Sequence, residues 1–152
     1  MSFVLSRKSL GKLQGVKEEL VEVVKTAITL TPVDFVVFEG LRSVERQREM
    51  VNSGASQTMK SRHITGHAVD LVPWNGELRW DLGMCYHIAE AAREAADQHK
   101  VDIVWGGAWC LLTGTDAPAD ELVAKYVARR RREGKKAFID AVHFELDSLT
   151  YP

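Results

Sequence analysis

Apolar residues recur every three or four positions over the first thirty residues, and charged residues fill the gaps between them. The apolar positions that keep this spacing are Leu13, Val16, Leu20, Val24, Ala27 and Ile28. This is the period of an amphipathic helix, so the sequence predicts a helix from about Ser9 to Thr29. Thr31-Pro32 ends that helix, because a proline keeps the residue before it out of the helical region.

Further along the chain, short apolar runs alternate with longer amphipathic stretches. The short runs predict strands at 35–39, 68–72, 103–105 and 139–146. The longer stretches predict helices at 44–51, at 82–99 and within 116–136, and Ser43 can cap the first of these. Helices mixed with short strands, without a regular βαβ repeat, indicate an α+β domain with a small antiparallel sheet and flanking helices.

The composition is that of a soluble globular protein. The 152 residues are 45% apolar, 27% charged and 8% aromatic, which suits one domain with its own core. A net charge of −1 gives no global field that would attract nucleic acid or a membrane. Cys85 and Cys110 lack CxxC spacing and are interpreted as buried or half-buried thiols. No stretch has the length of a signal peptide or a membrane span, so we expect a protein made in the cytoplasm without an ordinary export signal.

Two separated segments carry the residues that a metal site needs. Residues 61–70 read Ser-Arg-His-Ile-Thr-Gly-His-Ala-Val-Asp, and residues 140–145 read Asp-Ala-Val-His-Phe-Glu. Three such side chains can hold a zinc ion and leave its fourth position to water, while a further carboxylate takes the proton of that water. Alone, His63 would be an ordinary hydrogen-bonded polar residue. Together with Asp70 and His143, it is predicted to be a zinc ligand.

The spacing inside the first segment supports this prediction. Gly66 allows a turn after His63, and Asp70 lies on the strand that follows the turn. Ala68 shares the strand face of Asp70 and leaves room for the ion and a substrate. His67 projects to the opposite face, and a fourth protein ligand would close the position reserved for water, so the prediction leaves it out.

The second segment has a geometric constraint. On an unbroken strand Asp140 and His143 would point to opposite faces, because they are three residues apart. To act as the general base, Asp140 must therefore lie in the turn that enters the strand. Glu145 shares the face of His143 and is either a partner that orients an imidazole or a surface carboxylate. His87 and His99, in the alanine-rich helix, are interpreted as ordinary surface or half-buried residues.

These residues resemble the zinc D,D-peptidase family, which includes VanX- and VanY-type peptidases and the phage L-alanyl-D-glutamate endolysins. The resemblance to the phage branch covers nearly the whole chain. It is carried by residues 13–16, 39–47, 61–73, 105–107 and 140–146. The resemblance implies the D,D-peptidase fold shared with hedgehog domains, zinc bound by His63, Asp70 and His143, and Asp140 as the base.

The resemblance also assigns roles around the ion. It implies that Arg42 polarises the scissile carbonyl or steadies the oxyanion; the alternative is a surface salt bridge with Glu39 or Glu45. Four further residues are expected to bind substrate or to support the ligands: Ser61, Gln47, Glu145 and Trp105.

Two features depart from the family pattern. Ala108 follows the paired glycines where the family often has an Asp, and residues 111–137 are longer than the usual connection, which leaves open what borders the cleft there. The long connection carries a cationic run, formed by Lys125, Arg129 to Arg132, Lys135 and Lys136. This run is either a solvated helix face, since four consecutive residues cover all sides of a helix, or a surface that attracts anionic envelope polymers or phosphates.

Together these features predict a single-domain endolysin over residues 1–152, with an extra helical segment at about 111–137. We expect it to be a monomer that uses Zn²⁺ to hydrolyse the L-Ala–D-Glu bond of peptidoglycan, and to bind no nucleic acid and insert into no membrane. It would stay in the host cytoplasm until the membrane is permeabilised and then act on the wall. Two alternatives stay open: a D-Ala-D-Ala carboxypeptidase or dipeptidase, and a non-catalytic zinc-containing module that binds the wall.

Overall fold

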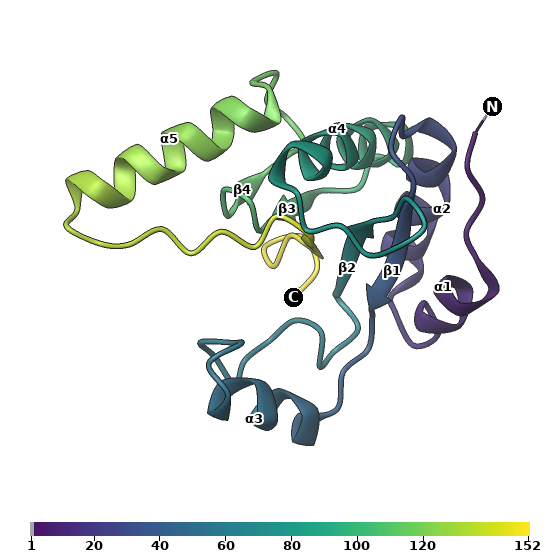
Figure 1. The fold of residues 1–152 in the computed structure, drawn as a ribbon, viewed down its shortest axis with the longest axis horizontal. Coiled ribbons are helices and arrows are strands. Elements are labelled where there is room, and N and C mark those ends of the chain that lie inside the picture. Colours follow the sequence, from purple (N-terminus) through teal and green to yellow (C-terminus); the bar gives the residue numbers. More distant parts are fainter. Residues whose placement is uncertain (1) are drawn as a thin grey trace.

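A computed structural model describes residues 2–152 and has the predicted α+β architecture. In chain order its elements are α1 (Arg7–Lys12), α2 (Glu18–Leu30), β1 (Phe35–Glu39), α3 (Val44–Asn52), β2 (Ala68–Pro73), α4 (Leu82–His99), β3 (Ile103–Trp105), β4 (Cys110–Leu111), α5 (Ala119–Arg132) and β5 (His143–Leu146). Helices α2 and α4 pack against each other beside the sheet, whereas α3 and α5 project away from it (Figure 1).

The five strands form one antiparallel sheet in the order β1-β2-β5-β3-β4. The small antiparallel sheet predicted from the sequence is therefore confirmed. Strand β4 has only two residues and was not predicted, because so short a strand leaves no alternating pattern. Strand β5 arrives from the far end of the chain and lies between β2 and β3, which puts the last strand at the centre of the sheet.

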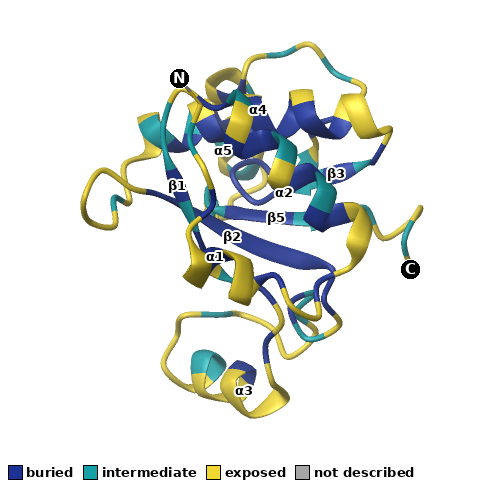
Figure 2. Ribbon diagram, turned by 90° about the vertical axis from the view of Figure 1, so that its right-hand side faces the viewer, coloured by how far each residue is buried: buried dark blue, intermediate teal, exposed yellow. Residues whose placement is uncertain are grey.

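The two faces of the sheet do different work. Strand β2 is buried along its whole length, as its uniform dark blue in Figure 2 shows. Val69 and Leu71 belong to the hydrophobic core that the sheet shares with α2 and α4, and Phe144 joins them from β5. Because side chains alternate along a strand, Asp70 and His143 point to the opposite face. One face therefore supplies the core and the other is left for polar chemistry.

Strand β1 contains a bulge that brings one more polar residue to this second face. Val37 pairs with Leu71 of β2, but the next pair joins Glu39 to Asp70, so one residue of β1 is left over. A bulge of this kind changes the face to which the following side chain points. Glu39, which simple alternation would place with Val37 in the core, thus shares the face of Asp70.

The predicted helix from Ser9 to Thr29 is wrong, because the structure has two helices there, α1 and α2. Gly15 lies between them with a φ of 84°, a conformation that interrupts a right-handed helix and that glycine adopts at little cost. Leu13 and Val16 are buried all the same, in the turn between the helices. The apolar period therefore matched a helix that the chain interrupts.

The other boundaries lie closer to the predicted ones. Helix α4 and strand β3 have the predicted bounds, and α5 lies inside the predicted 116–136 segment. The Ser43 cap is confirmed, since its side chain accepts a hydrogen bond from the backbone N–H of Arg46. The predicted strand 139–146 is too long, because β5 begins only at His143. Residues 139–142 form the turn that the Asp140 argument requires.

Candidate metal centre and groove

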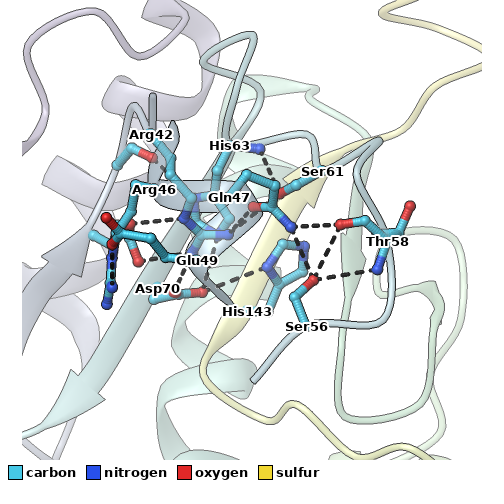
Figure 3. A network of polar contacts seen from close by, with 12 residues as sticks. Arg42, Arg46, Gln47, Glu49, Ser56, Thr58, Ser61, His63, Asp70 and His143 are labelled. Carbon is cyan, nitrogen blue, oxygen red and sulfur yellow. Dashed lines mark hydrogen bonds and ion pairs between the residues drawn. The ribbon is translucent and has the colours of Figure 1, made fainter. Parts of the chain in front are cut away.

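Within the described residues, three side chains of metal-ligand type converge at one point: His63, Asp70 and His143. One ligand atom from each lies within 4.8 Å of the other two. The Oδ1 atom of Asp70 is 3.2 Å from Nε2 of His63 and 3.4 Å from Nδ1 of His143. All three residues are buried, and Figure 3 shows them facing one another. The structure thus brings together the three residues that the sequence predicted as ligands.

The sheet register explains why residues so far apart in the chain meet. Asp70 of β2 lies directly opposite His143 of β5, on the same face of the sheet. His63 comes from the loop before β2, where the backbone turns at Gly66 with a φ of 77°. The loop is tied down by a hydrogen bond from the backbone N–H of Arg42 to the carbonyl of His63. Strand pairing places two of the side chains, and a pinned loop brings the third.

Each imidazole is oriented by an acceptor on the side away from the cluster. The Nδ1 atom of His63 lies 2.8 Å from the Gly40 carbonyl, and Nε2 of His143 lies 2.8 Å from Oε1 of Glu145. A carbonyl or carboxylate oxygen can only accept, so those ring nitrogens carry the protons. The opposite nitrogens, Nε2 of His63 and Nδ1 of His143, are then free to bind a metal ion.

The charges of the cluster are coupled. Burial raises the pKa of Asp70, but hydrogen bonds from His143 and His63 outweigh this and hold that pKa well below its usual range. Burial lowers the pKa of His143, whereas hydrogen bonds to Asp70 and Glu145 raise it further, to about 10. The ring therefore carries a proton at neutral pH in the metal-free protein, and a metal ion that binds there must displace it.

Asp140 lies in the turn before β5, beside the cluster. Its backbone N–H donates to the Gly106 carbonyl, and its own carbonyl accepts from the backbone N–H of His143. Burial raises the pKa of its carboxyl group, and the neighbouring charge of Asp70 raises it further. Asp140 lines the same cavity as the three ligand residues. The structure thus places it in the turn where the sequence argument required it to be.

Arg42 is buried, and its guanidinium group is surrounded by acceptors. Nε and Nη2 each donate to a different oxygen of Glu39 at 2.7 Å, so the pair is bidentate. Nη1 donates to Oε1 of Gln47 at 2.6 Å. Two longer contacts reach towards the cluster, from Nη1 to Oγ of Ser61 at 3.5 Å and from Nη2 to Oδ2 of Asp70 at 3.7 Å. The predicted alternative of a salt bridge with Glu39 exists, but it is buried and adjoins the cluster.

Gln47 and Ser61 hold this arrangement in place. Gln47 is fully buried, and its side-chain nitrogen donates to Oγ of Ser56 and to the carbonyl of Thr58, as Figure 3 shows. It thus connects Arg42 to the loop after α3 and has no surface for a substrate. Ser61 lines the cavity, and its Oγ accepts a hydrogen bond from the backbone N–H of His63.

The two tryptophans near the paired glycines have different environments. Trp105 was expected to bind substrate or to support the ligands, but it is fully buried and cannot contact a substrate. Its indole N–H donates to the carbonyl of Ala141, so it supports the turn that carries Asp140. Trp109, which the sequence argument did not select, lines the cavity with its ring 5.3 Å from that of His143. Its φ of 49° is a feature that no sequence pattern revealed.

The cluster opens onto a groove of about 710 Å³, called the metal groove below. One wall comes from α3 and the loop after it, through Met50, Thr58 and Lys60. The other wall carries three aromatic residues, Tyr126, Phe138 and Trp109, of which Phe138 and Trp109 stack on each other. A groove of this size, lined by aromatic groups with a few charged residues at its floor, is typical of a ligand site.

Helix α5 answers what borders the groove on the side that the sequence left open. Tyr126 and Arg130 of α5 line the metal groove, and Arg130 is the half-buried member of the four consecutive arginines. Its Nε donates to the carbonyl of Lys136, which ties the helix to the segment that returns to β5. The other three arginines are exposed, as expected for a solvated helix face.

The remaining histidines and the cysteines lie outside the cluster. The Nδ1 atom of His67 lies 2.7 Å from Oγ1 of Thr65, and His67 is absent from the three-residue cluster, as predicted. His87 and His99 are exposed. Cys85 is buried and Cys110 half-buried, and neither is in a disulfide, which confirms the interpretation of both as thiols.

The donor set suits a zinc ion. Two imidazole nitrogens and one carboxylate oxygen are the mixture that catalytic zinc sites use, with a further position left for water or substrate. Both imidazoles also have the outer acceptors that normally fix the ligands of such sites. The three residues line the metal groove, so an ion held by them would face the space that a substrate can enter.

Comparison with known proteins decides the family. A family model described as phage L-alanyl-D-glutamate peptidase matches residues 1–147. The chain belongs to this family. It is 33% identical over 114 residues to the L-alanyl-D-glutamate peptidase of Escherichia phage T5, a match that covers 72% of this chain and 83% of that protein.

Two further relatives of this L-alanyl-D-glutamate peptidase family member are informative. The L-alanyl-D-glutamate peptidase of Listeria phage A118 is 35% identical over 78 residues, which is 51% of this chain but only 27% of that protein. The crystal structure of the Serratia marcescens L-Ala D-Glu endopeptidase ChiX superposes with a TM-score of 0.77 at 36% identity. That match covers 99% of this chain and 95% of ChiX. It shows that the fold is that of an L-Ala D-Glu endopeptidase, as the resemblance implied.

Proposed function

We propose that this chain is a zinc-dependent endolysin that hydrolyses the L-Ala–D-Glu bond of peptidoglycan stem peptides. The proposal depends above all on the convergence of His63, Asp70 and His143 at the floor of a groove that also holds Asp140. Family membership and the names of the relatives supply the bond that is cut.

Each residue of the site has a role that follows from its place. A bound zinc ion supplies Lewis-acid chemistry, which activates water and polarises a carbonyl group. His63 holds the ion through Nε2, His143 through Nδ1 and Asp70 through Oδ1. Asp140 accepts a proton from the attacking water and delivers it to the leaving amine. Its raised pKa suits a group that must take up a proton and then release it.

Arg42 stabilises the negative charge that develops on the carbonyl oxygen. Its two N–H groups with the longest contacts, at 3.5 Å to Ser61 and 3.7 Å to Asp70, lie on the side of the cluster. Those two can turn to a substrate oxygen while the bidentate bonds to Glu39 keep the guanidinium plane fixed. The Glu39 pair is thus the support of Arg42 and not a competitor for its role.

Product analysis tests the proposed reaction. Purified peptidoglycan is digested with the zinc-loaded protein, and the products are analysed for new amino termini and free amino acids. We expect new amino-terminal D-Glu, and no reaction after chelation until zinc is added back. His63→Ala should abolish the reaction, whereas His87→Ala, which removes an exposed histidine outside the groove, should leave it unchanged.

The same digest separates the alternatives. Release of free D-alanine without new amino-terminal D-Glu would identify a D-Ala-D-Ala carboxypeptidase or dipeptidase. A wall that binds the protein and stays intact, with zinc or without it, would identify a non-catalytic binding module. Either result would overturn the proposal.

We also propose that the protein reaches its substrate as a monomer, after the host membrane has been permeabilised. No helix among residues 2–152 is long and apolar enough to cross a membrane. Release of the protein by a pore in the membrane would supply the passage. Lysis of intact host cells only when the membrane is permeabilised, and of isolated walls without that treatment, is the expected result; lysis of intact cells from outside would contradict it.

A further inference from the structure

A second cavity of about 670 Å³ lies between α1 and the edge strand β1, and it is called the β1-edge cavity below. Its lining includes Lys8 and Lys12 from α1, Val36 from β1, and Trp74 and Leu78 from the loop after β2. None of these five residues lines the metal groove. The mechanism proposed above makes no use of this cavity.

The β1-edge cavity joins the metal groove. Phe38, Glu39 and Arg46 line both, so the two spaces meet at the end of β1. A substrate that extends beyond the metal centre in this direction therefore enters the second cavity without crossing the outer surface of the protein. The two spaces form one binding site with two parts.

The order of the strands gives this extended site a direction. Glu39 of β1, Asp70 of β2 and His143 of β5 are paired in one row across the sheet, and β1 is its edge. On the other side of β5 lies β3, and the Gly106 that follows β3 is bonded to Asp140. The general base and α5 therefore lie on one side of the metal centre, and the β1-edge cavity lies on the other.

The chemistry of the reaction then fixes which half of the substrate goes where. This step rests on the proposed function. A base that returns a proton to the leaving amine must lie next to that nitrogen. The leaving amine belongs to D-Glu, so the residues from D-Glu onward extend towards Asp140 and α5. The half that precedes the cut bond, which begins with L-Ala, extends towards β1.

In peptidoglycan, L-Ala is the first residue of the stem and is joined through a lactyl group to an N-acetylated sugar of the glycan strand. The β1-edge cavity has the lining that such a sugar needs. Its apolar side chains are partly exposed, with 42% of Phe38, 36% of Trp74 and 37% of Leu78 accessible, and can cover the C–H face of a sugar ring. Lys8 and Lys12 supply donors for hydroxyl and carbonyl oxygens.

We propose that the β1-edge cavity binds the N-acetylated sugar that precedes L-Ala in the substrate. Its volume lies within the range of roughly 300–1,000 Å³ that is usual for ligand sites. The opposite end of the metal groove, with Arg130 and Tyr126, has the cationic character that suits the carboxylates of the following residues. The two ends thus differ in the same sense as the two halves of the substrate.

The test compares two soluble substrates that differ only in the sugar. One is the N-acetylated stem peptide, and the other is the same peptide attached to N-acetylmuramic acid. For the wild-type protein we expect kcat/KM to be about tenfold higher for the muramyl peptide, mainly through a lower KM, because the sugar adds binding that is the same in the ground and transition states.

Variants locate the effect in the cavity. Trp74→Ala and Leu78→Ala should each bring the ratio of the two kcat/KM values close to one and leave the free peptide unaffected. Leu82→Ala is the matched control, since Leu82 is also 37% exposed but lines neither space. It should keep the wild-type ratio. Because two separate cavity variants are used, a folding failure in one still leaves a decisive result from the other.

The outcomes separate this inference from the function on which it rests. If the wild-type protein cuts both substrates equally well, or if the cavity variants impair both to the same extent, the inference is wrong and the peptidase function stands. If neither substrate is cut at the L-Ala–D-Glu bond, the proposed function itself fails. A wild-type dimer that Trp74→Ala converts to a monomer in sedimentation would show that a second copy fills the cavity, and would also overturn the inference.

Discussion

Glu145 determines which nitrogen of His143 faces the cluster. Its carboxylate accepts the Nε2 proton, so the lone pair of the ring is on Nδ1, next to Asp70. A second contact, 3.9 Å to Nε of Arg62, holds the carboxylate in position. The sequence had left Glu145 either as such a partner or as a surface carboxylate. The two-residue spacing from His143, and not the burial of Glu145 alone, makes the contact possible.

Replacing Glu145 should weaken metal binding without removing a ligand. Glu145→Ala is expected to lower zinc affinity about 10- to 100-fold, the usual cost of removing a partner that orients a ligating histidine. Glu145→Gln keeps an acceptor oxygen and should recover most of that affinity. Competition with a chromophoric chelator measures both. Equal affinities for Glu145→Ala and the wild-type protein would show that the carboxylate does not orient His143.

The residues of the centre differ in how far the sequence could predict them. His63, Asp70, His143 and Asp140 were predictable, because the ligand types occur at spacings that a turn and a strand can bring together. The choice of Trp105 over Trp109 as a groove residue was not sound. Both follow the same apolar strand, and only the backbone turn at Trp109 decides which indole is buried and which faces the groove.

At the scale of elements, the turn between α1 and α2 supports the loop that carries His63. The backbone N–H of Lys17 donates to the Gly66 carbonyl, and the carbonyl of Gly15 lies only 2.3 Å from where a Cβ on Gly66 would be. The two loops therefore touch through their backbones. A side chain at Gly66 would separate them and move His63.

Gly66→Ala should therefore reduce stability and metal binding together. The positive φ and the contact with Gly15 are expected to cost about 2 kcal/mol or more, which is a fall in Tm of about 4–8 °C for a chain of this size. Gly83→Ala is the matched control, because Gly83 is helical with open space around it. It should raise stability by up to about 1 kcal/mol. Thermal unfolding measures both, and equal effects would contradict the role given to Gly66.

Helix α5 should contribute to substrate binding through one arginine of its basic run. Arg130 lines the metal groove on the Asp140 side, and D-Glu keeps one free carboxylate next to the cut bond. We expect Arg130→Ala to lower kcat/KM for the stem peptide about tenfold or more, since a charged hydrogen bond is lost. The effect should vanish with a peptide in which that carboxylate is an amide.

Arg131→Ala is the control for this prediction, because Arg131 is exposed and lies outside the groove. It removes the same charge from the same helix and should leave kcat/KM unchanged. If the two variants are impaired equally, the basic run acts as a general field and Arg130 has no particular role.

Elements were predicted best where one pattern ran without interruption. Helix α4 and strand β3 were predicted to the residue, because alanine-rich and β-branched runs with clear ends leave little choice. The α1–α2 turn and the bulge in β1 were not predictable, since both depend on contacts with other parts of the chain. A glycine inside an otherwise regular period was the one local sign of the first.

For the whole molecule, the fold separates stability from chemistry. One face of the sheet is fixed by a core with α2 and α4, so the other face can carry buried charges and histidines that contribute little to packing. The central position of β5 is what joins the two halves of the site, because it places His143 and Asp140 next to a strand laid down seventy residues earlier. The sequence could predict which residues meet here but not which strands lie between them.

Zinc content and turnover of Asp140→Ala, measured on the same sample, test the central claim most directly. Three residues hold the ion and Asp140 only moves protons, so the variant should fold and keep one zinc per chain while peptidoglycan hydrolysis falls about 100-fold or more. Turnover close to that of the wild-type protein, or loss of the zinc together with the activity, would contradict this division of roles.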